Sequence, residues 1–328
     1  MDLLTAQRVF QDLKLAAIPK DLKVTNTLYS LDVELRPELP VAKFLRKLPE
    51  LQYRLQLPHP LQPEIIPTQA IIRLQAPLAQ STFSFWDHFT KNDYSTEFIL
   101  GVQANGTPVT MEMSQNPHLL LAGATGSGKS VALHVMIANA ILNNHENYLV
   151  DPKLIEFESY RNLPQVNRLT HDAEDTQELF EDLEFKMHQR LLHLQRVGKT
   201  NYLAYNPQGA IFVFIDELAD LFGGSSNLQQ SLIKLTQKCR AAGIFIVAAT
   251  QRPSSDVVSG LLKANFPARI ACKTAALWDS RVILDQPGAQ NLMGRGDALL
   301  TNERHSMLRF QFLHVRPEDV QGRAVPSK

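Results

Sequence analysis

An apolar run that breaks into a glycine-rich turn constrains the fold of this chain more than any other feature. Run and turn read HLLLAGATGSGKSVAL over residues 118–133, and Gly123 to Ser130 fits the pattern G-x-x-x-x-G-K-[S/T]. Glycines let consecutive backbone N–H groups curl around a phosphate, and the amino end of a helix attracts an anion. The segment therefore predicts a strand, a phosphate-binding loop and a helix, in that order.

The loop is predicted to hold a nucleotide together with its cation. Lys129 should reach the β and γ phosphates and the Ser130 hydroxyl should bind Mg²⁺, so ATP and Mg²⁺ are the expected cofactors. Because a scaffold of buried strands does not need the phosphate ligand, the substitution Lys129→Ala should stop turnover and leave the fold intact. The predicted nucleotide-binding residues are Gly123, Ala124, Thr125, Gly126, Ser127, Gly128, Lys129, Ser130 and Val131.

Short apolar runs recur after residue 98 and alternate with longer amphipathic stretches. They read HLLLAG, NYLVDP, AIFVFIDE, GIFIVAAT and ARIACK, and they begin at residues 118, 147, 210, 243 and 268. Strands that are apolar throughout are typical of a parallel sheet covered by helices on both faces. We therefore expect an α/β fold of the P-loop NTPase kind, built on a parallel sheet.

The residues before this region predict a smaller, separate domain. Between residues 25 and 73, short apolar segments such as LYSLDVEL and AIIRLQ alternate with proline-rich stretches, which indicates a small α+β domain. Residues 76–95 read as a connection. We therefore expect the small domain with its connection over residues 1–97 and the larger domain over residues 98–328.

Polar residues follow two of the apolar runs at positions that suit ATP hydrolysis. Asp216 would complete the magnesium shell, and Glu217 would act as a general base on the attacking water. An acidic pair in such a place can also cap a helix, and that alternative stays open. Thr250 and Gln251 are neutral groups that could sense a γ phosphate or position water, although ordinary capping of a loop is an equal alternative.

Composition excludes several classes of protein. Lysine plus arginine total 33, as do aspartate plus glutamate, so the net charge gives no sign of a nucleic-acid or membrane partner. Two cysteines cannot form a disulfide framework, and no apolar run approaches the ~18 residues of a membrane span. Since no signal sequence opens the chain, the expected location is the cytoplasm.

Read with their neighbours, these motifs resemble the FtsK/SpoIIIE family of double-stranded DNA translocases. The resemblance covers residues 101–315 and implies a RecA-like motor domain that hydrolyses ATP and forms hexameric rings around duplex DNA. The residues before 98 are similar to the family's α domain. The segments that carry it are PHLLLAGATGSGKS, VDPKLIEF, FIDELADL, KCRAAGIFIVAATQRPSSDVVSGLLKANFPARIA and DSRVILDQPGAQNLMGRGDALL.

The same resemblance implies the motor alone, without the winged-helix domain or the membrane anchor of the chromosomal members. It also implies that Arg281, in the D-S-R motif, acts as an arginine finger on the γ phosphate bound by a neighbouring copy. The alternative for Arg281 is a salt bridge to Asp279 or Asp285. Arg240 is a second candidate for the finger, or for a phosphate contact within its own copy.

Two loops are expected to face DNA, over residues 160–171 and 296–310. A motor that follows any sequence should grip phosphates rather than base edges, which arginines on such loops can do. Solvated loop charges are the alternative. The candidate DNA contacts are Arg161, Arg168, Arg304 and His305.

The expected activity is ATP-driven, sequence-independent translocation along double-stranded DNA by a ring-shaped hexamer. A protein on a membrane or from a mobile element is a further candidate partner. Three alternatives stay open: a conjugative or packaging motor, a secretion-type ATPase that moves protein, and a nucleotide-dependent clamp without turnover. The presence of Lys129, Asp216 and Glu217 argues against the clamp.

Overall fold

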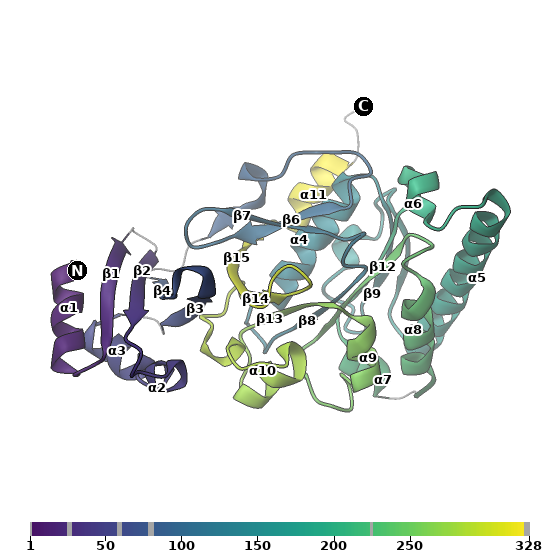
Figure 1. The fold of residues 1–328 in the computed structure, drawn as a ribbon. Helices are drawn as coiled ribbons and strands as arrows, with labels where there is room; N and C mark the ends of the chain where they lie inside the picture. Colours follow the sequence, from purple (N-terminus) through teal and green to yellow (C-terminus); the bar gives the residue numbers. More distant parts are fainter. Residues whose placement is uncertain (1, 25–27, 58–60, 78–81, 224–225, 325–328) are drawn as a thin grey trace. The chain divides into compact units, whose positions relative to one another are not determined.

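The computed structural model describes residues 2–24, 28–57, 61–77, 82–223 and 226–324 (Figure 1). Contacts divide the chain into two compact units. Unit 1 comprises Met1–Ser81 with Ala104–Gly106, and unit 2 comprises Thr82–Gln103 with Thr107–Lys328. Residues 82–97 are thus grouped with unit 2, while the division of the chain into domains between residues 97 and 98 stays a prediction.

Unit 1 is an antiparallel sheet with one face on a hydrophobic core. Tyr29, Leu31 and Val33 alternate along one strand and share a core with Phe10 and Phe44 of the helices. This period of two is what a strand with one buried face requires. The elements are α1 (Leu3–Asp12), α2 (Val41–Leu45), α3 (Leu48–Arg54), the 3₁₀ turn η1 (Pro67–Gln69), and a sheet of order β1-β2-β4-β3 formed by β1 (Ala17–Val24), β2 (Leu28–Leu35), β3 (Gln62–Ile66) and β4 (Ile71–Pro77).

Unit 2 is built on an 11-stranded sheet of order β10-β9-β11-β12-β8-β13-β14-β15-β6-β7, with β5 beside β15. The strands from β10 to β13 in this order are parallel, and those from β14 to β7 are antiparallel. The strands are β5 (Phe83–Ser84), β6 (Glu97–Val102), β7 (Pro108–Glu112), β8 (His118–Ala122), β9 (Glu146–Val150), β10 (Val166–Thr170), β11 (Ile211–Ile215), β12 (Ile244–Thr250), β13 (Ala268–Cys272), β14 (Asp297–Thr301) and β15 (Leu308–His314).

Helices cover both faces of the inner parallel strands, which is why strands such as β11 and β12 are buried along their whole length. In β11, Phe212 and Phe214 belong to one core and Ile211, Val213 and Ile215 to the other. α4 and α11 pack on the first core, and α5, α7, α8, α9 and α10 on the second. The helical elements are α4 (Lys129–Leu142), α5 (Ala173–Val197), α6 (Tyr202–Tyr205), α7 (Leu218–Phe222), α8 (Ser226–Lys238), α9 (Gly260–Asn265), α10 (Leu277–Leu284), α11 (Pro317–Ala324), and the 3₁₀ turns η2 (Phe85–Asp87), η3 (Glu158–Tyr160), η4 (Pro207–Gly209) and η5 (Ala289–Asn291).

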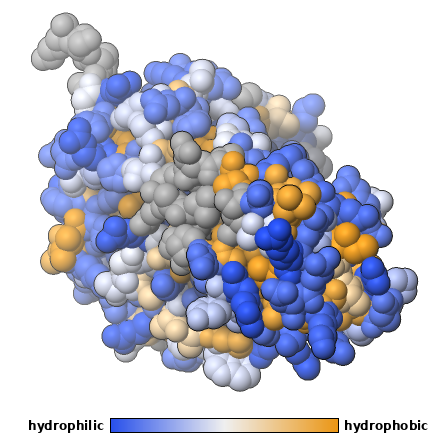
Figure 2. All heavy atoms as spheres, turned by 90° about the vertical axis from the view of Figure 1, so that its left-hand side faces the viewer, coloured by the Kyte–Doolittle hydropathy of each residue, from blue (hydrophilic) through white to orange (hydrophobic). Residues whose placement is uncertain are grey.

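The α/β fold expected from the sequence is confirmed, and each of the five apolar runs forms a parallel strand. The antiparallel half of the sheet was not expected from those runs. The face drawn in Figure 2 carries both hydrophilic and hydrophobic residues. Within the described parts of the chain, no helix combines the length and the apolar character that crossing a bilayer requires.

A buried amide side chain ties α4 to the irregular strand β6. On one side β6 pairs with β7, with a shift in register between Ile99 and Gly101, and on the other side it pairs with β15 only at Gly101 and Val102, so the backbone of Ile99 on that side needs another partner. Asn139 supplies it, since its Oδ1 accepts from the N–H of Ile99 at 3.0 Å and its Nδ2 donates to the carbonyl of Ile99 at 2.9 Å. Asn139 is 1% exposed, so water does not reach these groups freely.

We expect the near-isosteric substitution Asn139→Leu to lower the free energy of unfolding by about 2–4 kcal/mol, because each buried backbone group left unsatisfied costs about 1–3 kcal/mol. Urea titration measures the loss. The control Gln195→Leu, at an exposed position of α5, should stay within about 0.5 kcal/mol of the wild type. A loss under about 1 kcal/mol for Asn139→Leu would contradict the role given to this side chain.

Candidate functional site

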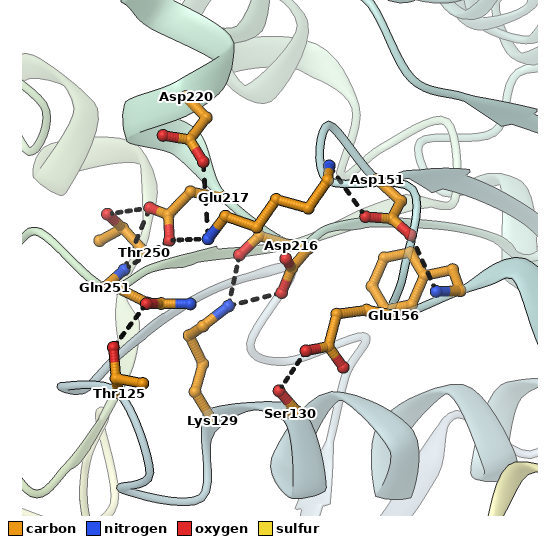
Figure 3. A network of polar contacts seen from close by, with 12 residues as sticks. Thr125, Lys129, Ser130, Asp151, Glu156, Asp216, Glu217, Asp220, Thr250 and Gln251 are labelled. Atoms are coloured by element: carbon orange, nitrogen blue, oxygen red, sulfur yellow. Dashed lines mark hydrogen bonds and ion pairs between the residues drawn. The ribbon is translucent and has the colours of Figure 1, made fainter.

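The candidate site lies at the edge of the sheet where β8, β9, β11 and β12 end. Because these strands are parallel, their carboxyl ends share one edge, and residues distant in sequence meet there. Figure 3 shows the side chains that follow the strands pointing toward one another.

The glycine-rich loop is gripped by backbone from two other segments. Gly128 has φ +107° and precedes α4, and a Cβ there would lie 2.0 Å from the backbone nitrogen of Gly296. The N–H of Gly296 donates to the carbonyl of Ser127 at 2.8 Å, and the N–H of Ala124 donates to the carbonyl of Lys273 at 2.9 Å. Only glycine fits at position 128, both for its φ and for this close approach.

Lys129 and Asp216 form a buried ion pair. The Lys129 ammonium donates to Asp216 Oδ1 at 2.5 Å and to the Asp216 carbonyl at 2.7 Å. Their side chains are 4% and 1% exposed. Lys129 therefore has a structural partner besides any phosphate. The substitution Lys129→Ala would remove a buried ion pair as well as a phosphate ligand, so an effect on the stability of the fold is expected.

Glu217 is held rigidly at the end of β11. Its Oε1 accepts from the Thr250 hydroxyl at 2.7 Å, and both carboxylate oxygens accept from the N–H of Gln251, at 3.0 and 2.9 Å. Oε1 also accepts a longer bond, 3.4 Å, from the N–H of Ala219 in α7. The helix cap considered as an alternative is thus present, and the same side chain faces the site.

Two further contacts join these groups to their surroundings. The Thr125 hydroxyl of the loop donates to Gln251 Oε1 at 2.9 Å, so the residue after β12 touches the glycine-rich loop directly. Lys153, which follows β9, lies 3.5 Å from carboxylate oxygens of both Glu217 and Asp220. Segments from four strands therefore interlock at this edge (Figure 3).

Ser130 begins a second polar chain on the other side of Lys129. Its hydroxyl donates to Glu156 Oε1 at 2.9 Å, and Glu156 Oε2 lies 3.7 Å from His134 Nε2. The Tyr160 hydroxyl lies 3.0 Å from His134 Nδ1. Burial lowers the pKa of His134 to about 4, so this imidazole is neutral at pH 7.

The residues at this edge fit a magnesium nucleotide. Asp216 Oδ2 and the Ser127 hydroxyl are buried without a hydrogen-bond partner among the described residues. Carboxylate and hydroxyl oxygens suit Mg²⁺, which commonly takes one or two carboxylates and completes its octahedron with phosphate oxygens and water. Across the described ranges no three His, Cys, Asp or Glu side chains form a ready metal cluster.

Comparison with known proteins assigns the chain to a family. The model of the FtsK/SpoIIIE family matches residues 85–210. The DNA translocase FtsK of Streptococcus pneumoniae is 36% identical over 285 residues, which are 78% of this chain and 37% of that protein. The chain belongs to the FtsK/SpoIIIE family. FtsK of Leptospira interrogans is also 36% identical, over 70% of this chain and 26% of its own length.

This FtsK/SpoIIIE chain thus spans about a third of the length of these curated relatives. Solved structures support its fold. A monomer of the pCW3 conjugation coupling protein TcpA with ATPγS has a TM-score of 0.70 at 22% identity, covering 97% of this chain and 98% of that one. The cytoplasmic domain of the Type VII secretion ATPase EccC from Thermomonospora curvata has a TM-score of 0.61 at 23% identity, over 70% and 30%.

The arginine expected to act on a neighbouring copy is exposed on α10. Its guanidinium lies 5.0 Å from the centre of the Trp278 ring. Asp279 accepts from the N–H of Ala276, and Asp285 pairs with Lys263 and Arg269. The alternative salt bridges of Arg281 are therefore not formed among the described residues, while its action in trans stays a prediction.

The candidate DNA contacts lie at opposite edges of the sheet. Arg161 follows η3 and lies against His171, at the edge where β9 and β10 end. Arg304 and His305 lie between β14 and β15, and β14 is antiparallel to β13, so their loop is at the far edge. Arg240 precedes β12, whose seven residues span about 23 Å at ~3.3 Å per residue, so it lies at the other end of this strand from the candidate site. A phosphate contact of Arg240 stays a prediction.

The sequence suggested that Arg168 lies on a loop, and the structure shows that it does not. It belongs to β10, and its guanidinium contacts the carboxylates of Asp175, Glu178 and Asp182 in α5. A guanidinium with three carboxylates around it is a poor phosphate contact, because a phosphate would have to displace them. The predicted exposed loop charge at position 168 is corrected to a strand-to-helix contact.

Sequence reasoning missed two features of the site. Glu156 stands in the segment VDPKLIEF, but nothing in its spacing from β9 indicated a contact with Ser130. The turn at residues 294–297, sequence GRGD, grips the loop through Gly296. The available signal in the sequence was the pair of glycines on either side of Arg295, which favours a tight turn. In the structure these glycines have φ +90° and +94°.

We expect Lys129→Ala to lower the free energy of unfolding by about 3–5 kcal/mol, since it leaves the Asp216 carboxylate buried and unpaired. Asp216→Asn added to Lys129→Ala should recover part of that loss, because it removes the uncompensated charge. Urea unfolding of the four proteins of this double-mutant cycle gives the coupling energy. A Lys129→Ala protein as stable as the wild type would contradict the structural role of this pair.

Proposed function

We propose that this chain is an ATP-driven motor that moves along double-stranded DNA. The observation that carries the proposal is the convergence of Lys129, Asp216 and Glu217 at one sheet edge, with Gln251 bonded to the glycine-rich loop. Family membership supports it, because the curated relatives are named DNA translocases. ATP and DNA meet in the cytoplasm, which we propose as its location.

The glycine-rich loop would bind the phosphates of ATP. Backbone N–H groups of the loop would surround them at the amino end of α4, and Lys129 would exchange the Asp216 carboxylate for a phosphate. Ser130 and Asp216 would hold Mg²⁺, which offsets the charge of the phosphates when bound. The freed Asp216 carboxylate stays compensated only if a cation replaces the ammonium group.

Glu217 would accept the proton of the attacking water. Its hydrogen bonds to the Thr250 hydroxyl and to the backbone N–H of Gln251 fix the carboxylate in one orientation. A general base needs a fixed position within hydrogen-bond reach of the water that it activates. Gln251 links this base to Thr125. Movement of the loop around ATP would therefore reach the base through one residue, Gln251, which is proposed as the residue that senses the γ phosphate.

Arg281 would complete the site of an adjacent copy in a ring-shaped hexamer. It is exposed, and among the described residues it makes no ion pair that would have to break first. An arginine finger supplied in trans is worth roughly 10³–10⁵ in rate where it has been measured. The ring, rather than the single chain, is thus the proposed catalytic unit.

DNA would be held by its phosphates, so that movement is independent of sequence. Arg161, Arg304 and His305 remain the proposed contacts, and their positions at two edges of the sheet suit contacts at two levels of a channel. A protein of a membrane or of a mobile element is the proposed further partner.

The proposal is tested by measuring ATP hydrolysis with and without duplex DNA, together with displacement of a triplex-forming strand from linear duplex. Strong stimulation and displacement are expected. Stimulation by a protein substrate alone would instead favour a secretion motor, and absence of turnover would favour a nucleotide-dependent clamp. Displacement only in the presence of a membrane partner would favour a conjugative or packaging motor.

Glu217→Gln should bind ATP with nearly unchanged affinity and hydrolyse it about 10²–10⁴ times more slowly, because it keeps the shape of the side chain and loses the base. Steady-state phosphate release and binding of a fluorescent ATP analogue measure the two effects. Glu181→Gln, exposed on α5, is the matched control. Phosphate release at the wild-type rate would remove Glu217 from the catalytic role.

Arg281→Ala should keep nucleotide binding and lose turnover, because it is expected to act on the ATP of the adjacent copy. Mixed with Glu217→Gln protein, it should regain part of the activity at interfaces that join an intact Glu217 to an intact Arg281. Hydrolysis by mixtures at several ratios measures this. Mixed rings no more active than either parent would count against action in trans.

A further inference from the structure

We propose that Glu156 is a positioning residue of the cation site, which accepts the hydrogen bond of the Ser130 hydroxyl and so leaves a lone pair of that oxygen directed toward Mg²⁺. The inference rests on the nucleotide site proposed above and adds to it a carboxylate outside the loop and outside the end of β11. Figure 3 shows Glu156 beside Ser130, on the opposite side of Lys129 from Glu217.

A serine hydroxyl has one proton and two lone pairs. To bind a cation through a lone pair, it must direct its proton elsewhere, and an acceptor that fixes this direction strengthens the ligand. Glu156 Oε1 is that acceptor, at 2.9 Å from Ser130 Oγ. Asp216 does not fill this place, because its Oδ1 bonds to Lys129 and its Oδ2 has no hydrogen-bond partner among the described residues.

The segment that carries Glu156 is held without any help from the Ser130 contact. Asp151 folds it, since its Oδ1 accepts from the N–H of Lys153 at 3.2 Å and its Oδ2 accepts from the N–H of Phe157 at 3.0 Å. The Phe157 ring is fully buried in the core beneath α4. The turn that places Glu156 beside Ser130 is therefore held by contacts other than those of the Glu156 side chain.

A neighbouring residue of α4 limits where the Glu156 carboxylate can go. His134 stands four residues after Ser130 and so shares its face of the helix. Its Nε2 lies 3.7 Å from Glu156 Oε2, and its Nδ1 is held by the Tyr160 hydroxyl. The Glu156 side chain is 27% exposed, so it is only partly open to solvent. The carboxylate is thus confined between Ser130 and His134.

The test compares the affinity of a fluorescent ADP in excess EDTA with its affinity across a titration of Mg²⁺, using the full chain. For Glu156→Ala we expect the Mg²⁺ concentration at half-effect to rise about 10–100-fold, the usual cost of losing a residue that orients a metal ligand. Affinity in EDTA should change less than about threefold, because the phosphate cradle is untouched. ADP avoids hydrolysis, so the readout does not depend on activity.

Two further variants complete the design. Glu181→Ala removes a carboxylate on α5 that bonds only to Gln177 among the described residues, and it should match the wild type. Glu156→Gln keeps an acceptor oxygen and loses the charge, so its Mg²⁺ requirement should rise less than that of Glu156→Ala. If the alanine variant unfolds, the glutamine variant carries the same test.

Each outcome decides the inference. An unchanged Mg²⁺ requirement in both Glu156 variants would overturn it. Equal losses in EDTA and in Mg²⁺ would also overturn it, because they would show that Glu156 supports the loop in general. A wild-type chain that binds no nucleotide under either condition would overturn the proposed function itself, and this inference with it.

Discussion

A charge that is removed from water needs an opposite charge inside the protein. Lys129 and Asp216 are buried, and each is the partner of the other. Lys129 begins α4 after β8, whereas Asp216 follows β11, and β12 lies between these two strands. The pair therefore ties the glycine-rich loop to the end of β11 across a third strand. In the proposed cycle, a phosphate takes the ammonium group and a cation takes its place beside Asp216. Each of the two buried charges thus keeps an opposite charge beside it in both states, which limits the cost of the exchange in a buried place.

The antiparallel half of the sheet has a part in the same site. Asp297, at the start of β14, accepts from the N–H of Met293 and pairs with Arg309 of β15. Gln311 of β15 donates to the carbonyl of Arg295. These contacts shape the turn whose Gly296 lies against Gly128, so the strands beyond β13 hold the phosphate-binding loop from outside. A domain that ended at β13 would leave the loop without this support.

The sequence predicted the elements whose signal is local. Five parallel strands could be found because burial on both faces makes them apolar throughout, and Asp216, Glu217 and Gln251 could be placed because parallel strands end at one edge. β10 could not be found, since an edge strand with polar Asn167 and Arg168 lacks that signal. Nor could the contact of Glu156 with Ser130, which depends on how Asp151 and a buried phenylalanine fold an irregular turn. Long-range packing of this kind leaves no period in the sequence.

The exposed end of α10 is compatible with the proposed action of Arg281 on an adjacent copy. Other arginines of the described chain pair with acids, as Arg168 does with three and Arg269 with Asp285. Arg281 instead stacks on Trp278, which is 69% exposed. A large aromatic ring left in water forgoes the burial that normally stabilises it, and an arginine above it keeps its donors free. Both features suit the proposed action of Arg281 on the ATP of an adjacent copy, because the guanidinium remains accessible while the ring holds it in place.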